Sequence, residues 1–169
     1  TINGGKFENY GSCSSCNPNG WAYTAKSVGT LYVNGGEIHG VQGALGISAG
    51  YAEIRGGTFY AHACELHGHQ GEGSNNAFYG LYVAGEEDEV KCVVYDGNII
   101  SEGKYAAALI GNDNTNGDGG INADATSEIK GGTFTATLAS TPALKGAPNT
   151  GNPIITGGTF SSDVSEYVA

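Results

Sequence analysis

Short stretches of this chain alternate apolar and polar residues and then reach a glycine, which is followed two positions later by Phe or Ile. The alternation predicts a short strand, and the glycine predicts a tight turn before a second inward-pointing side chain. A glycine at such a turn permits a positive φ angle. The pattern occurs six times, as TINGGKF from Thr1, YVNGGEI from Tyr32, AEIRGGTF from Ala52, VVYDGNI from Val93, SEIKGGTF from Ser127 and PIITGGTF from Pro153.

The last glycine of each phrase marks the period of the repeat. These marker glycines are Gly5, Gly36, Gly57, Gly97, Gly132 and Gly158, so the successive intervals are 31, 21, 40, 35 and 26 residues. A fainter second phrase lies between them, in LGISAG from Leu45, GLYVAG from Gly80, AALIGN from Ala107 and ALKGAP from Ala143. Each repeat therefore has at least two strands, and the longer intervals carry insertions.

These features predict an all-β fold, a right-handed parallel β-helix with about six rungs and long loop insertions, in which residues 1–169 form a single module. Stacked rungs align equivalent residues, which predicts one interior ladder of aliphatic side chains and a second that contains the Phe residues. An antiparallel sandwich is the competing fold. It explains the pattern less well, because insertions of variable length would disturb the registers of hairpins. The ladders are Ile2, Val33, Ile54, Val94, Ile129 and Ile155, and Phe7, Ile38, Phe59, Ile99, Phe134 and Phe160.

Composition narrows the possible partners. The chain has 30 glycines among 169 residues, and 7 Lys and Arg against 17 Asp and Glu give a net charge of -10. Such a chain lacks the basic surface that binds a phosphate backbone, so no nucleic-acid partner is expected. Its apolar stretches are far shorter than the roughly 20 residues that span a bilayer, so no membrane insertion is expected.

The segment GAPNTGNPIITGGTFSSDVSEYVA from Gly146, together with the recurring GGTF units, resembles β-helix regions in large cell-surface proteins of anaerobic Gram-positive gut bacteria. Such regions resemble the pectate-lyase-like β-helix. The resemblance implies an extracellular location on the bacterial surface but no particular activity. Thr1 falls inside a repeat, and Ala169 follows Tyr167 and Val168 without a polar cap, so we expect a monomeric module within a longer chain.

Two insertions, near residues 8–29 and 60–79, contain cysteine and histidine residues. A tetrahedral zinc site is one interpretation, with CxxC at Cys13 and Cys16 and histidines in HACELHGH. The preferred interpretation is disulfide bonding, because the number of cysteines is even and extracellular modules use disulfides to fix long loops. It pairs Cys13 with Cys16 and Cys64 with Cys92. The histidine candidates for the metal site are His62, His67 and His69.

Two other insertions are acidic. Residues 86–89 read EEDE, and NDNTNGDGG from Asn112 partly matches a calcium-binding loop, with Asp113 and Asp118 as candidate ligands. The match is incomplete, since the first position is Asn and the twelfth is Ala123. Solvated surface and ordinary turn chemistry explain the same residues. Calcium and zinc therefore both remain candidate ligands.

Three classes of function fit a β-helix with loops. A polysaccharide lyase needs a strong base with calcium-bridging carboxylates, but Arg55 lies in a repeat turn. A hydrolase needs converging carboxylates, but Glu53 and Glu128 occupy outward positions. Both enzyme classes are therefore less favoured by the sequence. Glycan binding needs only exposed aromatic rings and amide side chains. A spacer that displays other domains needs no site. The preferred prediction is a non-catalytic module that binds glycans or mediates adhesion through its loops, with Trp21, Tyr23, Asn75, Asn76 and Tyr79 as ligand-binding residues.

Overall fold

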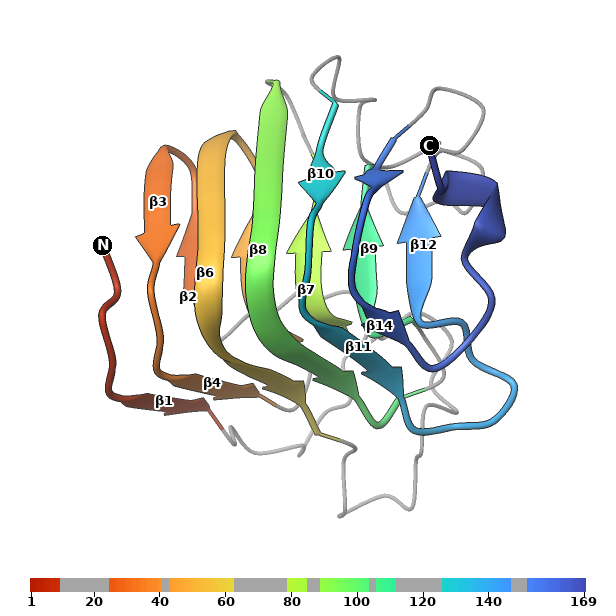
Figure 1. Cartoon of the computed structure of the whole chain (residues 1–169). Helices are drawn as coiled ribbons and strands as arrows, with labels where there is room; N and C mark the ends of the chain where they lie inside the picture. Colours follow the sequence, from red (N-terminus) through yellow and green to blue (C-terminus); the bar gives the residue numbers. More distant parts are fainter. Residues whose placement is uncertain are drawn as a thin grey trace.

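The computed structural model describes residues 1–9, 25–40, 43–62, 79–84, 89–103, 106–111, 126–146 and 152–169. These residues form β-strands in two sheets and one short 3-10 helix, η4 (Ser165–Tyr167). The strands lie side by side along the molecule, from the N-terminal end to the C-terminal end (Figure 1). The all-β prediction is confirmed.

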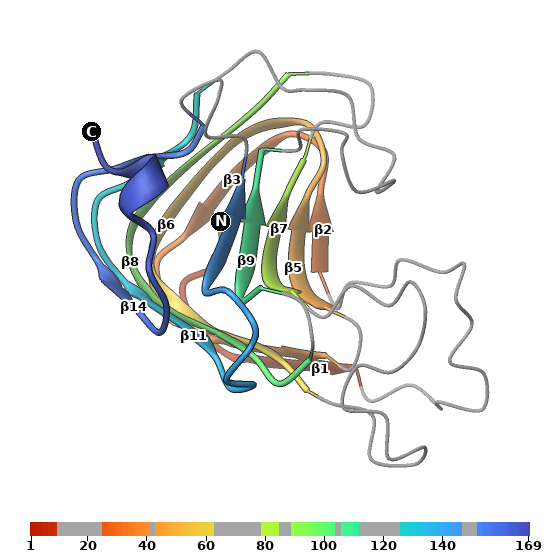
Figure 2. The same cartoon turned by 90° about the vertical axis from the view of Figure 1, so that its right-hand side faces the viewer.

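The first sheet has nine strands, and two of them are long. Its order is β1 (Lys6–Asn9), β4 (Glu37–Gly40), β6 (Gly50–Ala61), β8 (Val90–Ser101), β10 (Glu128–Ile129) and β13 (Ile154–Ile155). Three more strands pair beside this path: β3 (Thr30–Val33) with β6, β11 (Thr133–Ala136) with β8, and β14 (Thr159–Phe160) with β11. The long strands β6 and β8 bend halfway, so the sheet has two arms (Figure 2). The first arm holds the first halves of β6 and β8 with β3, β10 and β13, and the second arm holds their second halves with β1, β4, β11 and β14.

The second sheet lies across the interior from the bent sheet (Figure 2). It has five strands in the order β12 (Leu144–Gly146), β9 (Ala108–Ile110), β7 (Tyr79–Val83), β5 (Gly43–Ile47) and β2 (Ala25–Ser27). Four of these strands, β5, β7, β9 and β12, contain parts of the fainter second phrase of the repeat. Every strand pairing among the described residues is parallel, which contradicts an antiparallel sandwich.

The register of the first sheet confirms that both predicted ladders stack, but Phe7, at the N-terminal end of the second ladder, is 44% exposed and not interior as predicted. Val33 pairs with Ile54, Ile54 with Val94, and Val94 with Ile129. An isolated bridge adds Ile2 beside Val33, and the pairing of β10 with β13 adds Ile155 beside Ile129. The second ladder pairs in the same way from Phe7 through to Phe160. Because removing apolar surface from water is the main favourable term in folding, the ladder residues other than Phe7 form the core, with Ile2 and Phe160 partly buried at its ends.

The six marker glycines produce the bend between the two arms. All six have positive φ angles, from 93° at Gly5 to 138° at Gly97, as the sequence predicts. They also stack closely. A Cβ on Gly57 would lie 3.0 Å from the carbonyl oxygen of Gly36, and a Cβ on Gly132 would lie 3.0 Å from that of Gly97. Both the backbone conformation and the space therefore require glycine.

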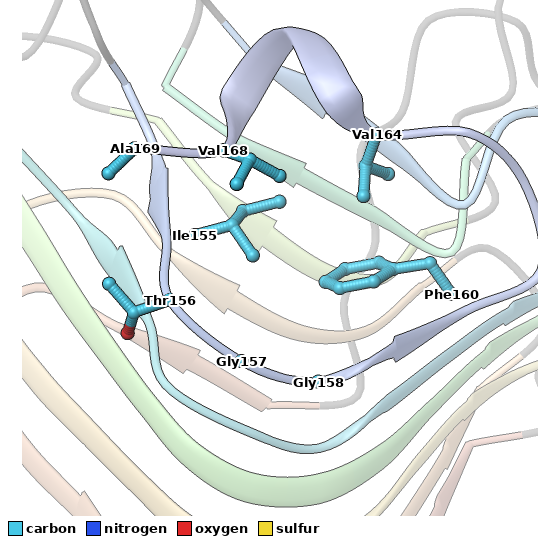
Figure 3. A pocket seen from close by; sticks show the side chains of 8 residues that line it. All are labelled: Ile155, Thr156, Gly157, Gly158, Phe160, Val164, Val168 and Ala169. Atoms are coloured by element: carbon cyan, nitrogen blue, oxygen red, sulfur yellow. The ribbon is translucent and has the colours of Figure 1, made fainter.

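Residues 161–169 lie across the C-terminal end of the two sheets. The backbone N–H groups of Ala136 and Ala143 donate to the hydroxyls of Ser161 and Ser162, at 2.9 and 2.7 Å. The N–H of Gly146 likewise donates to the hydroxyl of Tyr167. A shallow hollow of about 520 Å³ remains there, lined by Ile155, Phe160, Val164 and Val168 among others (Figure 3). Hydroxyl groups of this segment thus accept hydrogen bonds from backbone N–H groups in β11, in β12 and just before β12.

Replacing Gly57 by alanine should destabilise the module, because the change forces a side chain into a positive-φ position beside a carbonyl oxygen. The conformational term alone costs about 2 kcal/mol. A loss of this size lowers the Tm of a chain of this length by roughly 4–8 °C. Gly29→Ala is the control, since a Cβ at Gly29 would meet no atom within 4 Å. Equal melting temperatures for the two variants in calorimetry would contradict the glycine argument.

Candidate functional site

The outer surface of the first arm carries a cluster of tyrosines and paired charges. Side chains alternate along each strand, so the residues beside the interior ladder point outward. Parallel register then aligns Tyr32, Glu53, Val93, Glu128 and Ile154 across β3, β6, β8, β10 and β13. We call the cluster the tyrosine face. It comprises Tyr32, Tyr51, Glu53, Arg55, Lys91, Tyr95, Glu128 and Lys130.

Glu53 lies at the centre of the tyrosine face and is held by its neighbours on β6. The hydroxyl of Tyr51 donates to its Oε1 at 2.6 Å, and the guanidinium of Arg55 donates to its Oε2 from Nε at 2.9 Å and from Nη2 at 2.5 Å. The side chain of Glu53 is only 14% exposed, whereas that of Arg55 is 56% exposed. The carboxylate is therefore fixed in position below a more accessible cation.

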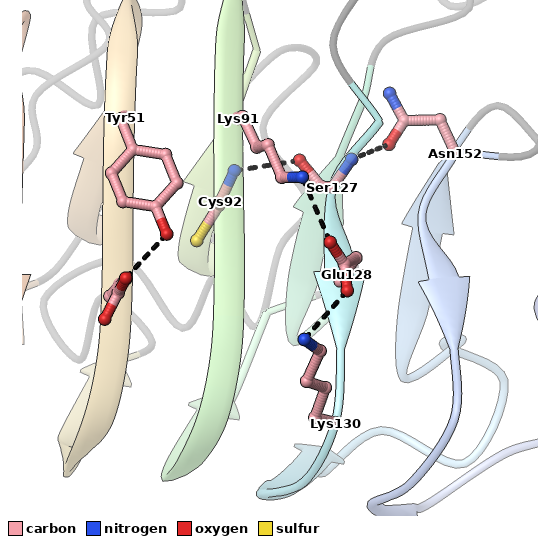
Figure 4. A network of polar contacts seen from close by, with 8 residues as sticks. Tyr51, Lys91, Cys92, Ser127, Glu128, Lys130 and Asn152 are labelled. Carbon is pink, nitrogen blue, oxygen red and sulfur yellow. Dashed lines mark hydrogen bonds and ion pairs between the residues drawn. The ribbon is translucent and has the colours of Figure 1, made fainter.

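Glu128 forms the equivalent centre on β10. Lys91 from β8 contacts its Oε1 at 3.0 Å, and Lys130 contacts its Oε2 at 3.0 Å (Figure 4). Tyr95, on β8, connects the two carboxylate centres. Arg55 lies 5.5 Å and Lys130 5.3 Å from the centroid of its ring, distances at which a cation attracts the aromatic face.

Two tyrosine rings of this face remain open to solvent. Tyr95 is 41% and Tyr32 is 39% exposed, although both lie on regular strands. Tyr32 meets Tyr51 edge to face, with 6.5 Å between ring centroids. Exposed rings beside fixed donors and acceptors are the groups that bind amphipathic ligands such as sugars.

The same contacts keep both carboxylates ionised. The hydroxyl of Tyr51 and then the guanidinium of Arg55 lower the pKa of Glu53, and Lys130 and then Lys91 lower the pKa of Glu128. The bond to Glu53 raises the pKa of Tyr51. A general acid in glycoside hydrolysis needs a raised pKa, so neither carboxylate is suited to that role.

Of the predicted ligand-binding residues, Tyr79 is placed differently from the prediction, which assigned it to an exposed loop surface. It begins strand β7 and is fully buried, with its ring centroid 5.9 Å from that of Tyr82. A strand that begins earlier than the sequence suggested is the physical reason, because it draws Tyr79 into a small apolar cluster with Tyr82 and Leu109. Tyr79 therefore cannot contact a glycan. Trp21, Tyr23, Asn75 and Asn76 lie outside the described residues.

Cys92 is a free thiol in the core, which corrects the predicted Cys64–Cys92 disulfide. Its position pairs with Ala52, an interior residue of β6, and its backbone N–H donates to the hydroxyl of Ser127 at 3.0 Å (Figure 4). Burial raises the pKa of the Cys92 thiol to about 12. The even number of cysteines suggested a pairing that ignored the inward direction of this residue. Cys13, Cys16 and Cys64 lie outside the described residues.

His62, a candidate metal ligand, lies on the outer surface of the second arm beside His39 from the neighbouring repeat. Nδ1 of His39 and Nε2 of His62 are 2.9 Å apart, and the ring centroids are 5.2 Å apart. Glu37 flanks His39 at 3.2 Å, and Glu102 flanks His62 at 3.7 Å. The two rings therefore meet through one shared N–H.

No group of three metal-ligating side chains occurs among the residues that the structure describes. His39 and His62 form a hydrogen-bonded pair there. The other candidates for zinc or calcium, His67, His69, Asp113 and Asp118, lie outside the described ranges.

Sequence reasoning missed the tyrosine face because it looked for binding residues in the insertions. The sequence did contain one signal for this surface. Tyr32, Glu53 and Glu128 each occupy the outward position next to a residue of the interior ladder. Taken alone, Tyr32 is also explained as a side chain that simply packs beside the strands. Only the register between repeats brings Arg55, Tyr95 and Lys130 together.

Comparisons of this chain with protein-family models, with curated proteins and with solved structures find no match. Among the described residues, no helix is long and apolar enough to cross a membrane. Interpretation of the site therefore depends on its own chemistry.

Native Cys92 should resist alkylation by iodoacetamide at pH 8, because it is fully buried and its raised pKa leaves almost no thiolate. It should react in guanidinium chloride without any reductant. Peptide mass mapping before and after unfolding measures both states. A Cys92 peptide that becomes alkylated only after reduction would restore the disulfide pairing.

Proposed function

We propose that this chain is a non-catalytic module of an extracellular bacterial cell-surface protein that binds glycans through aromatic side chains on a right-handed parallel β-helix. The observation that carries the proposal is the tyrosine face, where Tyr32 and Tyr95 are exposed beside carboxylates and cations already held in position. Trp21 and Tyr23 in the first insertion remain proposed contributors.

The fold part of the proposal is supported by the way the repeats stack. Each repeat adds one or two parallel strands to the bent sheet, and several add a strand to the opposite sheet. Parallel neighbours need a crossover connection, and right-handed crossovers predominate strongly in proteins. The aligned marker glycines and continuous interior ladders are what a β-helix with about six rungs requires.

The binding part is supported by the rigidity of the face. Glycan hydroxyls both donate and accept hydrogen bonds, and this surface offers carboxylate acceptors beside cationic donors. Because ion pairs and cation–π contacts already restrain those side chains, binding orders few of them and loses little entropy. Adhesion by such a module follows from display of many copies, since single aromatic contacts are weak.

A structural spacer is the second candidate. The observation that favours it is that the charges on the tyrosine face are paired within the face, so an outer surface of this kind is stable without a ligand. The same ladders and stacked turns that support a binding surface also make a stiff support for other domains.

A glycan array covering bacterial, plant and mucin structures distinguishes these candidates. We expect the purified chain to be retained on at least one glycan class, with no new reducing ends or unsaturated products in the supernatant. We expect retention because the rings of Tyr32 and Tyr95 are exposed, and we expect no cleavage because Glu53 and Glu128 are ionised.

Two outcomes would contradict the proposed function. If no class of glycan retains the chain, the spacer interpretation replaces binding. If oligosaccharide products accumulate, the module is a carbohydrate-active enzyme. In the second case the catalytic groups lie away from the tyrosine face, and each remaining carboxylate becomes a target for Asp→Asn or Glu→Gln replacement.

A further inference from the structure

We infer that the ligand of the tyrosine face is a neutral, linear polysaccharide that lies along the axis on which the repeats stack. This inference rests on the glycan-binding function proposed above and specifies the class and direction of the ligand. It follows from three features of the face: the repeats that supply its rings, the pairing of its charges, and the charge of the whole chain.

The rings are supplied by successive strands of the first sheet. Tyr32 lies on β3, Tyr51 on the neighbouring β6, and Tyr95 on β8 beyond it. Neighbouring strands are about 4.8 Å apart, so the strands that carry Tyr32 and Tyr95 are separated by about 10 Å along the stacking axis. Between the two exposed rings lie Glu53 and Arg55 of β6. Val93 is the register partner of Glu53 on β8, and Tyr95 lies two residues beyond it, so the line between the exposed rings crosses the strands with a slant toward the turns. A sugar chain that follows the stacking axis with this slant meets a ring, then polar groups, then a second ring.

A chain running across the axis would meet a different surface. Along β6 the outward groups are Tyr51, Glu53 and Arg55, which are bonded to one another. Along β8, Val93 is only 3% exposed and separates Lys91 from Tyr95. No single strand of the tyrosine face presents two exposed rings, so only a chain that crosses the strands, close to the axial direction, uses both Tyr32 and Tyr95.

The charges of the face favour a neutral ligand. Arg55 is paired with Glu53, and Lys91 and Lys130 share Glu128, so each of these three cations already contacts a carboxylate of the face. The existing ion pairs therefore compete with any acidic ligand for the same cations. An acidic polymer would have to displace these carboxylates and approach a chain of net charge -10. Hydroxyl groups of a neutral sugar can instead bond to the paired groups without separating them.

Affinity electrophoresis in gels that contain galactomannan, xyloglucan, mixed-linkage β-glucan or polygalacturonate tests both parts of the inference. We expect retention in at least one neutral gel and none in polygalacturonate. In the retaining gel, Tyr32→Ala and Tyr95→Ala should each weaken binding about fivefold, which is the usual size of one aromatic contact. Tyr32→Phe and Tyr95→Phe are the matched controls, because they keep the ring. Oligosaccharides of the retaining polymer should bind at least about fivefold more tightly as tetramers than as dimers, since only the longer chain spans both rings.

The outcomes separate this inference from the broader function. Retention that is lost in Trp21→Ala but unchanged in both tyrosine variants would overturn the tyrosine face as the site and leave glycan binding intact. Stronger retention in polygalacturonate would overturn the neutral class. Equal affinity for dimers and tetramers, measured on the unaltered chain by calorimetry, would overturn the axial direction even if a variant fails to fold. A chain that binds no glycan on the array or in any gel would overturn the proposed function itself.

Discussion

The structure depends on the stacked glycine turns between the two arms of the first sheet. Each marker glycine has a positive φ, and the position of a Cβ on five of them would lie 2.9–3.3 Å from the carbonyl oxygen of the preceding marker glycine. No other residue type fits both conditions without strain. The turns therefore fix where every repeat bends, and a fixed bend fixes which residues on either side of it face the interior.

The outer surface follows from the same constraint. Once Ile54, Val94 and Ile129 are aligned in the interior, Glu53, Val93 and Glu128 must be aligned outside, since successive strand residues point to opposite faces. Residues as far apart in sequence as Tyr32 and Lys130 thereby become parts of one surface. Insertions of different length between repeats do not disturb it, because the register is set at the turns and ladders.

The regular part of the fold was predictable from the sequence, whereas the site was not. The marker glycines and both ladders could be read directly, since each needs only local alternation and one special backbone angle. Tyr79 could not be placed because the start of β7 depends on pairing with β5 and on packing against Tyr82 and Leu109. For Cys92, the alternation of inward and outward side chains along the strand was a better guide to its state than the number of cysteines, because the alternation places its thiol in the core beside Ala52. The tyrosine face needs contacts between repeats, and a single phrase carries no information about them.

Rigidity and chemical reactivity are opposed on this surface. The ion pairs and hydrogen bonds that hold Glu53 and Glu128 also stabilise their charged forms, and this lowers the pKa of each. A carboxylate held in this way is a dependable hydrogen-bond acceptor but a poor proton donor near neutral pH. Arg55 is likewise held in its charged state by Glu53, so it cannot serve as a base. The contacts that hold the face rigid therefore disfavour the protonated carboxylate that a general acid needs for cleavage of a glycosidic bond, and this supports the proposal that the face binds a ligand.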